Sequence, residues 1–343
     1  MNTLRFAIAT CLLISACDSN PTTPGSGQEP FDSLTVDASS TWALVRLGDP
    51  ASTVSAADPT TSAEWDIGFF ATSVMLNGGA AGPGEVVGHC LCANAGATDD
   101  QILALVPAAE RQRFLDVGMA RVPATPDDWQ SDALAPAIEG WYAYDSATHI
   151  VSAAPEKVWK IRTSDGAFAK LHVIDIADAA QAHAGRVTIE FAVQDAPGSP
   201  LGAAQTATLD ASGGGRVYFD LLRAEVTDAS DWDIAIEGYD IRINGGVSGG
   251  GGAGAVLADE SFDEMTDASD APAEVYAGDA FGGVFDEHPW YRYNLEGNHQ
   301  IHPTFDVYLV RRGDDVYKVQ LVSYYGPTGD TRQITFRYAL LTE

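Results

Sequence analysis

The sequence has few basic residues, few cysteines and no long apolar run in its body. Its 343 residues include 19 Lys and Arg against 48 Asp and Glu, a formal net charge of −29 at pH 7. Nucleic acids and anionic lipid surfaces are bound by basic faces, so this composition argues against nucleic acid as a partner. After Cys17, no stretch is long and apolar enough to cross a bilayer as a helix.

The four cysteines are too few for a disulfide framework of the kind that stabilises small secreted domains. Cys11 falls in the leader described below, so Cys90 and Cys92 are the two left in the body. With His89 they form a candidate site for a soft metal such as zinc or copper(I). A structural metal site normally has four ligands, so we favour two small buried residues or a local disulfide instead.

The N-terminus has the features of a bacterial lipoprotein leader. Arg5 gives a positive start, residues 6–14 form a short apolar run, and Ile14-Ser15-Ala16-Cys17 matches a lipobox. We therefore predict a signal peptide at 1–17, lipidation at Cys17 and a flexible tether at 18–32. Two or more acyl chains anchor a protein stably, so we expect a lipid-anchored protein of the cell envelope, in the outer membrane, with its face undetermined.

The body of the chain repeats itself. Five landmarks recur in the same order, and they predict repeat one at 33–194, a linker at 195–205 and repeat two at 206–343. The landmarks are Val36-Asp37-Ala38-Ser39 and Leu209-Asp210-Ala211-Ser212, Trp65-Asp66-Ile67 and Trp232-Asp233-Ile234, Asn77-Gly78-Gly79 and Asn244-Gly245-Gly246, Trp141-Tyr142-Ala143-Tyr144 and Trp290-Tyr291-Arg292-Tyr293, and Thr188-Ile189-Glu190-Phe191 and Thr335-Phe336-Arg337-Tyr338.

The patterns within each repeat predict strands. Residues 170–176 and 318–324 alternate and are rich in Val, Ile and Tyr, and Asp165-Gly166 is typical of a hairpin turn. The exception lies in repeat one, where Asp99-Asp100 precedes a helical pattern that Pro107 divides into two short helices. The expected fold is mainly β, with two tandem all-β domains and a short helical insertion in the first.

No set of residues predicts catalysis. Gly246-Val247-Ser248-Gly249-Gly250 matches a hydrolase motif by accident of a glycine-rich run, and no helix follows it. We therefore expect a binding protein and no enzyme. Trp65 and Trp232 are expected to anchor the core, and Asn77-Gly78 and Asn244-Gly245 to form tight turns with positive φ.

One long string resembles the HmuY family of haem-binding lipoproteins. It runs from Trp232-Asp233-Ile234 through Tyr239-Asp240-Ile241-Arg242-Ile243-Asn244-Gly245-Gly246 to Ala255-Val256, and the hairpin at 307–338 is similar to the family's C-terminal part. The resemblance implies an almost entirely β fold, an acylated protein at the outer membrane and, in haem-capturing members, iron acquisition through haem.

The haem ligands do not follow directly from the resemblance. Haem iron is held by axial ligands such as His or Met in an apolar pocket. The position of the family's axial His falls near Asn294 in repeat two and Asp145 in repeat one, and neither is such a ligand. The haem-binding candidates are the nearest histidines, His149 and His299, together with His288 for the family's other His and Met265 as a thioether ligand.

Two functions compete on this basis. The first is non-enzymatic binding of haem or a related porphyrin, with an outer-membrane receptor as a possible further partner. The alternative is a surface or periplasmic interaction lipoprotein that retains the scaffold, has lost haem binding and binds another ligand or protein. A weaker third hypothesis is metal sequestration by His89, Cys90 and Cys92.

Overall fold

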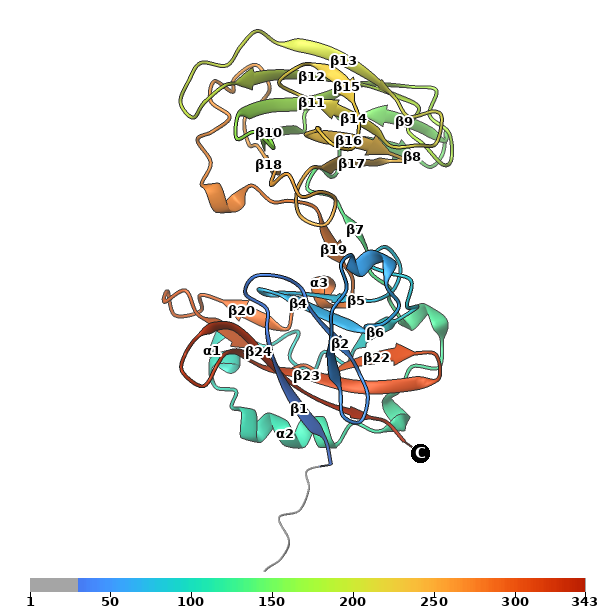
Figure 1. Cartoon of the computed structure of the whole chain (residues 1–343), viewed down its shortest axis with the longest axis vertical. Coiled ribbons are helices and arrows are strands. Elements are labelled where there is room, and N and C mark those ends of the chain that lie inside the picture. Colours follow the sequence, from blue (N-terminus) through green and yellow to red (C-terminus); the bar gives the residue numbers. More distant parts are fainter. Residues whose placement is uncertain (1–29, 343) are drawn as a thin grey trace, which may run out of the picture.

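The computed structural model describes residues 30–342, so Cys17 and the predicted leader lie outside the described residues. The chain forms two lobes, one above the other in Figure 1, and two chain segments cross between them. We call residues 30–132 with 283–342 the lower lobe, and residues 136–279 the upper lobe. The predicted mainly β fold is confirmed. Among the described residues, no helix is long and apolar enough to span a membrane.

The lower lobe contains a five-stranded sheet, a four-stranded sheet and a hairpin. The first has the order β1 (Asp32–Asp37), β24 (Thr331–Leu340), β23 (Asp315–Tyr325), β22 (Tyr308–Arg312) and β6 (Val87–Cys90). The second has the order β3 (Ser52–Val54), β2 (Ala43–Arg46), β4 (Ile67–Phe70) and β5 (Ser73–Leu76), and the hairpin pairs β20 (Tyr291–Tyr293) with β21 (Ile301–Pro303).

The upper lobe has the same architecture. Its five-stranded sheet has the order β13 (Gln205–Asp210), β12 (Arg186–Gln194), β11 (Phe168–Ala177), β10 (Val158–Arg162) and β18 (Gly254–Leu257). The four-stranded sheet has the order β15 (Glu225–Thr227), β14 (Val217–Asp220), β16 (Ile234–Glu237) and β17 (Asp240–Ile243), and the hairpin pairs β8 (Tyr142–Asp145) with β9 (Ile150–Ala153).

The helices are short. As the sequence predicts, Pro107 separates α1 (Asp99–Leu103) from α2 (Pro107–Leu115), but the N-cap of α1 is Thr98, which forms a capping box with Gln101. A further helix, α3 (Val284–Glu287), follows the lower end of the crossing, and the sequence pattern does not predict it. Single 3-10 turns occupy 59–61, 119–121, 126–128 and 273–275.

Each lobe is assembled from halves of both repeats. The lower lobe joins the first half of repeat one (30–132) to the second half of repeat two (283–342), because β1 pairs with β24 and β6 with β22. The upper lobe joins the second half of repeat one to the first half of repeat two, because β12 pairs with β13 and β10 with β18. The predicted repeat boundaries remain a prediction about sequence units, and in space the two units have exchanged halves.

The cores show the same exchange. In the lower lobe Phe69 stacks on Phe336 with ring centroids 5.1 Å apart, and in the upper lobe Phe191 meets Phe219 at 5.5 Å. Each pair joins side chains from different repeats, and all four side chains are fully buried. Burial of a large aromatic side chain is worth about 1.5–3 kcal/mol, so each lobe depends on both repeats for its stability.

The exchange passes through two short strands between the lobes. β7 (Ala133–Ala135) and β19 (Ala280–Gly282) pair antiparallel, with Leu134 opposite Phe281. Each strand follows the first half of its repeat, so equivalent segments of the two repeats meet here (Figure 1). This is the arrangement of a dimer with swapped halves whose two subunits have been joined by residues 195–204, the part of the predicted linker that precedes β13.

A buried carboxylate precedes each crossing strand. Asp279 accepts hydrogen bonds from the backbone N–H groups of Ala137 at 2.9 Å and Ile243 at 3.0 Å. Asp132 accepts the N–H of Leu76 at 2.9 Å. Burial raises the pKa of both carboxyls, and that of Asp132 reaches about 7, with the nearby charge of Asp286 adding to the rise. The chain therefore holds a carboxyl that titrates near neutrality beside the crossing.

The exchange predicts the behaviour of a cut chain. A specific protease site placed in the largely exposed linker 195–204 should give two fragments that stay together in size-exclusion chromatography and separate only in denaturant. The reason is that every lobe contains strands of both fragments. In the control, cuts that flank both crossing strands should release the upper lobe as a separate species. Fragments of the linker-cut chain that part in native buffer would contradict the exchange.

The second prediction concerns Asp132. Its pKa in the folded state is about 7 against an ordinary value of 3.8, so the folded state holds the proton more tightly and stability falls as pH rises from about 4 to about 7. Asp132→Asn removes this dependence and keeps an acceptor for the Leu76 N–H. Urea denaturation should show a variant that matches the parent at pH 4 and exceeds it above pH 7, by at most about 4 kcal/mol at 1.4 kcal/mol per pKa unit.

Asp279→Asn is the matched control. Its two carboxylate oxygens each accept a backbone N–H, and an amide nitrogen cannot accept either of them. This variant should therefore be less stable than the parent at pH 7. A gain in stability for Asp279→Asn, or none for Asp132→Asn, would show that the raised pKa of Asp132 does not govern the pH dependence.

Candidate functional site

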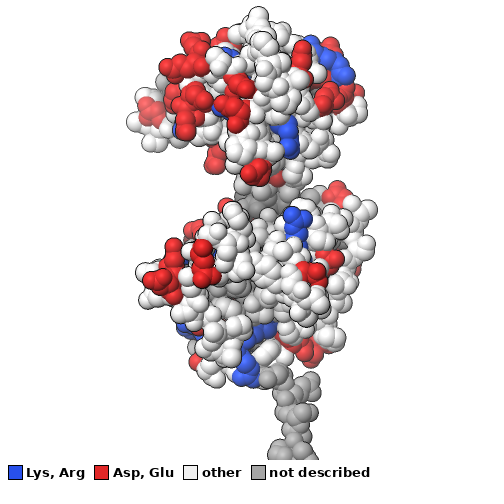
Figure 2. All heavy atoms as spheres, turned by 90° about the vertical axis from the view of Figure 1, so that its left-hand side faces the viewer, with Lys and Arg blue, Asp and Glu red and all other residues white. Residues whose placement is uncertain are grey.

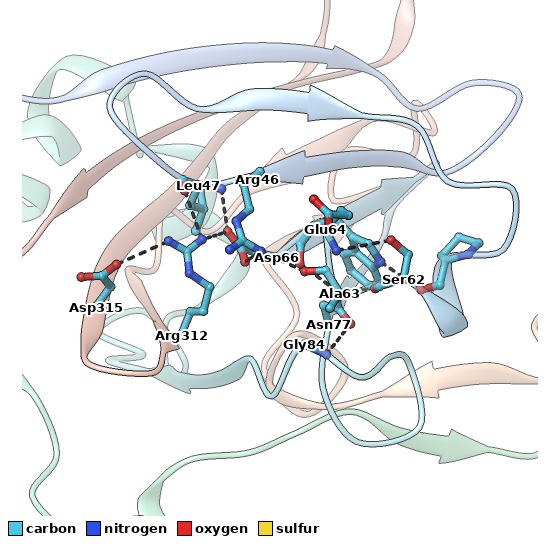
Figure 3. A network of polar contacts seen from close by, with 12 residues as sticks. Arg46, Leu47, Ser62, Ala63, Glu64, Asp66, Asn77, Gly84, Arg312 and Asp315 are labelled. Carbon is cyan, nitrogen blue, oxygen red and sulfur yellow. Dashed lines mark hydrogen bonds and ion pairs between the residues drawn. The ribbon is translucent and has the colours of Figure 1, made fainter.

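The motif Trp-Asp, twelve residues ahead of Asn-Gly-Gly, is structural. Asp66 is 1% exposed, accepts the Leu47 N–H at 2.7 Å and binds the guanidinium of Arg312 at 2.5 Å (Figure 3). Arg312 belongs to the other repeat, so this ion pair joins the two halves of the lower lobe. Desolvation raises the pKa of Asp66, and its bonds to Leu47 and to arginine oppose the rise. Trp65, which the sequence predicts to anchor the core, is fully buried beside it.

The Asn-Gly-Gly turns differ in detail from the expectation. Positive φ occurs at Gly79 (62°) and Gly246 (66°), the third residue of each motif, and not at the Asn-Gly pair. A Cβ on Gly78 would lie 2.1 Å from the Val86 carbonyl oxygen, so close approach of the backbone is what requires that glycine. Asn77 itself donates to the Trp65 carbonyl and accepts the Gly84 N–H (Figure 3). The motif therefore shapes the fold.

A wide cleft lies on the upper lobe, where three hairpin ends meet. It has a volume of about 880 Å³ and is walled by the hairpin β8–β9, the connection after β11 and the turn between β16 and β17. Three tyrosines, one histidine and several aliphatic side chains line it, together with Asp178 and Gln181. We call it the tyrosine cleft, and the residues that define it here are Tyr142, Tyr144, His149, Ile150, Ile176 and Tyr239.

The hairpin presents its tyrosines to one side. Tyr142 and Tyr144 lie two residues apart on β8, so their side chains share one face of the hairpin. Asp145 closes the turn by accepting the N–H groups of Ala147 and Thr148. Tyr142 packs against Tyr239 with ring centroids 5.1 Å apart. Burial raises the pKa of Tyr239, so its hydroxyl keeps its proton at neutral pH.

Tyr144 and His149 form a hydrogen-bonded pair at the mouth of the tyrosine cleft. The Tyr144 Oη lies 2.6 Å from Nδ1 of His149, and Tyr144 is 55% exposed. His149 has a φ of 56°, which is uncommon for any residue other than glycine and costs about 1–3 kcal/mol. The surrounding hairpin holds this backbone in place and directs the imidazole to the phenol.

The lower lobe repeats this pair without the same cleft. Tyr293 Oη lies 2.7 Å from Nδ1 of His299, whose φ is 58°. Here Tyr291 bonds to Thr72, which stands at the position that Tyr239 has in the upper lobe, and the hydroxyl of Tyr325 accepts the Ile301 N–H. The hairpin β20–β21 is thereby held against its lobe.

A smaller pocket of about 470 Å³ lies beside the hairpin of the lower lobe. Tyr293 and Arg292 line it together with His288, whose side chain is 37% exposed. Arg292 is already bound to Asp99 and to the Ala97 carbonyl. The pocket brings His288 near Tyr293, but it is charged and smaller than the tyrosine cleft.

The structure separates the four haem-binding candidates that the sequence suggests. His149 and His299 lie on hairpins of different lobes, so they do not converge on one site. Met265 is 3% exposed and packs with Val158 and Phe262 in a core cluster, away from both pockets. Of the four, only His149 lines the tyrosine cleft. Sequence reasoning missed the tyrosines, although Trp-Tyr-x-Tyr followed by His recurs in both repeats.

His89, Cys90 and Cys92, the candidate site for a soft metal, do not form a metal site. Cys90 and Cys92 are joined by a disulfide, which leaves no thiolate to bind a metal. Nδ1 of His89 lies 2.8 Å from the Asp128 carbonyl. Within residues 30–342 no group of three or more His, Cys, Asp or Glu side chains is arranged to hold a metal ion. Of the two alternatives that we favoured from the sequence, the local disulfide is present.

Comparison with known proteins adds a family. The family model described as HmuY protein matches residues 40–191 and 214–338, which together span most of the chain and one repeat each. A search of curated proteins finds no match.

Solved structures give weak likenesses. A protein from Bacteroides vulgatus described as HmuY-like and heme binding is 15% identical, with 37% of this chain and 86% of that chain covered and a TM-score of 0.18. A Bacteroides fragilis lipoprotein is 19% identical, with 49% and 94% covered and a TM-score of 0.18. The apo HmuY analogue of Tannerella forsythia is 14% identical, with 62% and 96% covered and a TM-score of 0.17. At these TM-scores the likenesses carry no further argument.

Proposed function

Because this chain belongs to the HmuY family, we propose that it binds haem or a related porphyrin without catalysis, as a lipid-anchored protein of the cell envelope that serves iron acquisition. The observation that carries the proposal is the tyrosine cleft. Its aromatic and aliphatic walls suit the flat apolar faces of a porphyrin, and its volume of about 880 Å³ lies within the usual range for ligand pockets.

The donor groups of the cleft also fit an iron porphyrin. Phenol and imidazole are both known axial ligands of haem iron, and Tyr144 and His149 supply one of each at the mouth. Since His299 lies in the other lobe, the donors come from the upper lobe alone. The porphyrin would supply the iron, and the chain would supply the walls of the tyrosine cleft and the donor atoms. An outer-membrane receptor that takes up the ligand is part of the same proposal.

A second candidate function is an interaction lipoprotein that does not bind haem. It is favoured by charge: the net charge is −29, and Figure 2 shows acidic side chains gathered on the face of the upper lobe seen there. The propionates of haem are anionic, and no Lys or Arg lines the tyrosine cleft. A basic protein or an uncharged ligand would fit this surface better.

Titration of the full chain with haemin tests the first function. We expect a shifted Soret band that saturates at one haemin per chain. His149→Ala should weaken binding by at least tenfold, and His299→Ala, the matched change in the other lobe, should leave it unaltered. If the haemin spectrum does not change when the parent protein is added, the haem function is wrong and the interaction function is favoured.

The anchor is tested separately. Cys17 is proposed as the acylated N-terminus of the mature protein. Cys17→Ala should therefore move the protein from the membrane fraction to the soluble fraction of cells, because the acyl chains that hold it there are lost. Mass spectrometry of the parent should find acylation on Cys17. A parent protein in the soluble fraction would contradict the anchor and leave haemin binding untouched.

A further inference from the structure

We propose that Tyr144 is the axial iron ligand of the tyrosine cleft, and that His149 is a positioning residue that hydrogen-bonds the ligating phenolate. This inference rests on the proposed haem function and goes beyond it, because it assigns the bond to iron to a residue that the sequence did not single out. It also reverses the role expected for His149, which the sequence suggested as a ligand itself.

The first argument is the direction of the side chains. Nδ1 of His149 lies 2.6 Å from Tyr144 Oη, so the imidazole is directed at the phenol oxygen. Tyr144 is 55% exposed at the mouth and shares one hairpin face with Tyr142, whose ring forms part of the wall. A porphyrin lying on this wall would meet the phenol oxygen of Tyr144 from its open side.

The second argument is that the same Tyr–His pair occurs in two hairpins whose turns differ in length. Tyr144 and His149 are five residues apart, whereas Tyr293 and His299 are six apart. Both pairs nevertheless have the same hydrogen bond, at 2.6 and 2.7 Å, and both histidines have φ near 57°. The geometry of the pair therefore does not depend on one turn length. What differs between the lobes is the cleft beside it, which only the Tyr144–His149 pair adjoins.

The third argument is chemical. A phenolate is a hard anionic donor that suits iron(III), and a hydrogen bond from a neighbouring N–H holds its orientation and supports its charge. When haemin carries hydroxide on iron, the Tyr144 phenol gives its proton to that hydroxide, which leaves as water, and the phenolate oxygen forms the bond to iron. Nδ1–H of His149 then donates to this oxygen. Iron stays in the iron(III) state, and no other reactant is needed.

Three variants of the full chain separate the ligand from its neighbour. Tyr144→Phe keeps the ring and removes the oxygen, and it should weaken haemin binding at least 100-fold. His149→Ala should weaken it by about 10- to 100-fold, the usual effect of losing a partner that orients a metal ligand. Tyr293→Phe is the matched control in the lower lobe, where the pocket is smaller and charged, and it should bind haemin as the parent does.

Resonance Raman spectroscopy distinguishes a Tyr144 that binds iron from a Tyr144 that only supports the fold. The parent and His149→Ala should both show the vibrations of an iron(III)-bound phenolate, and Tyr144→Phe should lack them. Both changed side chains are largely exposed, and circular dichroism checks that the variants fold. The opposite pattern, in which Tyr144→Phe binds normally and His149→Ala abolishes binding, would overturn the inference and make His149 the ligand. Absence of haemin binding by the parent would instead refute the proposed function.

Discussion

In each lobe the first strand of one repeat pairs with the last strand of the other, and the rest of the structure depends on this pairing. In the lower lobe β1 and β24 are antiparallel neighbours, and in the upper lobe the same neighbours are β13 and β12. A unit whose two ends lie side by side can be joined end to start by a short connection without disturbing its strand order. The linker 195–204 makes that connection in the upper lobe. The two lobes are in turn connected by the crossing strands β7 and β19.

Buried polar groups reinforce the pairing of unlike halves. In the lower lobe the ammonium of Lys318 donates to the carbonyls of Phe114 and Val117 at the end of α2, and in the upper lobe Lys170 donates to those of Phe262 and Met265. Each lysine lies on the second half of one repeat and each acceptor on the first half of the other. Removing one partner from a buried charged contact is strongly destabilising. The lobes are therefore specific assemblies, even though their halves come from distant parts of the chain.

The sequence was sufficient for the strands, the duplication and the break between α1 and α2, because these follow from local periodicity and from self-comparison. It could not reveal the exchange. The first halves of the two repeats have similar strand patterns, and Ile67 and Ile234 are both fully buried, so the apolar pattern does not say which second half each first half joins. Whether the halves are exchanged depends on where the chain crosses between the lobes. The crossing strands β7 and β19 have only three residues each, which is too short for a recognisable pattern. The tyrosine cleft was missed for a related reason: its walls come from three hairpin ends far apart in sequence.

Duplication has left two hairpins with one chemical pair and two different surroundings. In the lower lobe the indole of Trp290 donates to the Thr72 carbonyl, and Tyr325 holds the backbone at Ile301, so the hairpin β20–β21 is fastened to the lobe. In the upper lobe Tyr239 packs against Tyr142 and donates its hydroxyl to the Ala180 carbonyl, which puts an aromatic wall where the lower lobe has a fastening. A ligand needs walls and a free mouth more than it needs a firmly held hairpin. The tyrosine cleft of the upper lobe is therefore where we place the proposed ligand. In the lower lobe the same pair belongs to a hairpin that is fastened to its lobe.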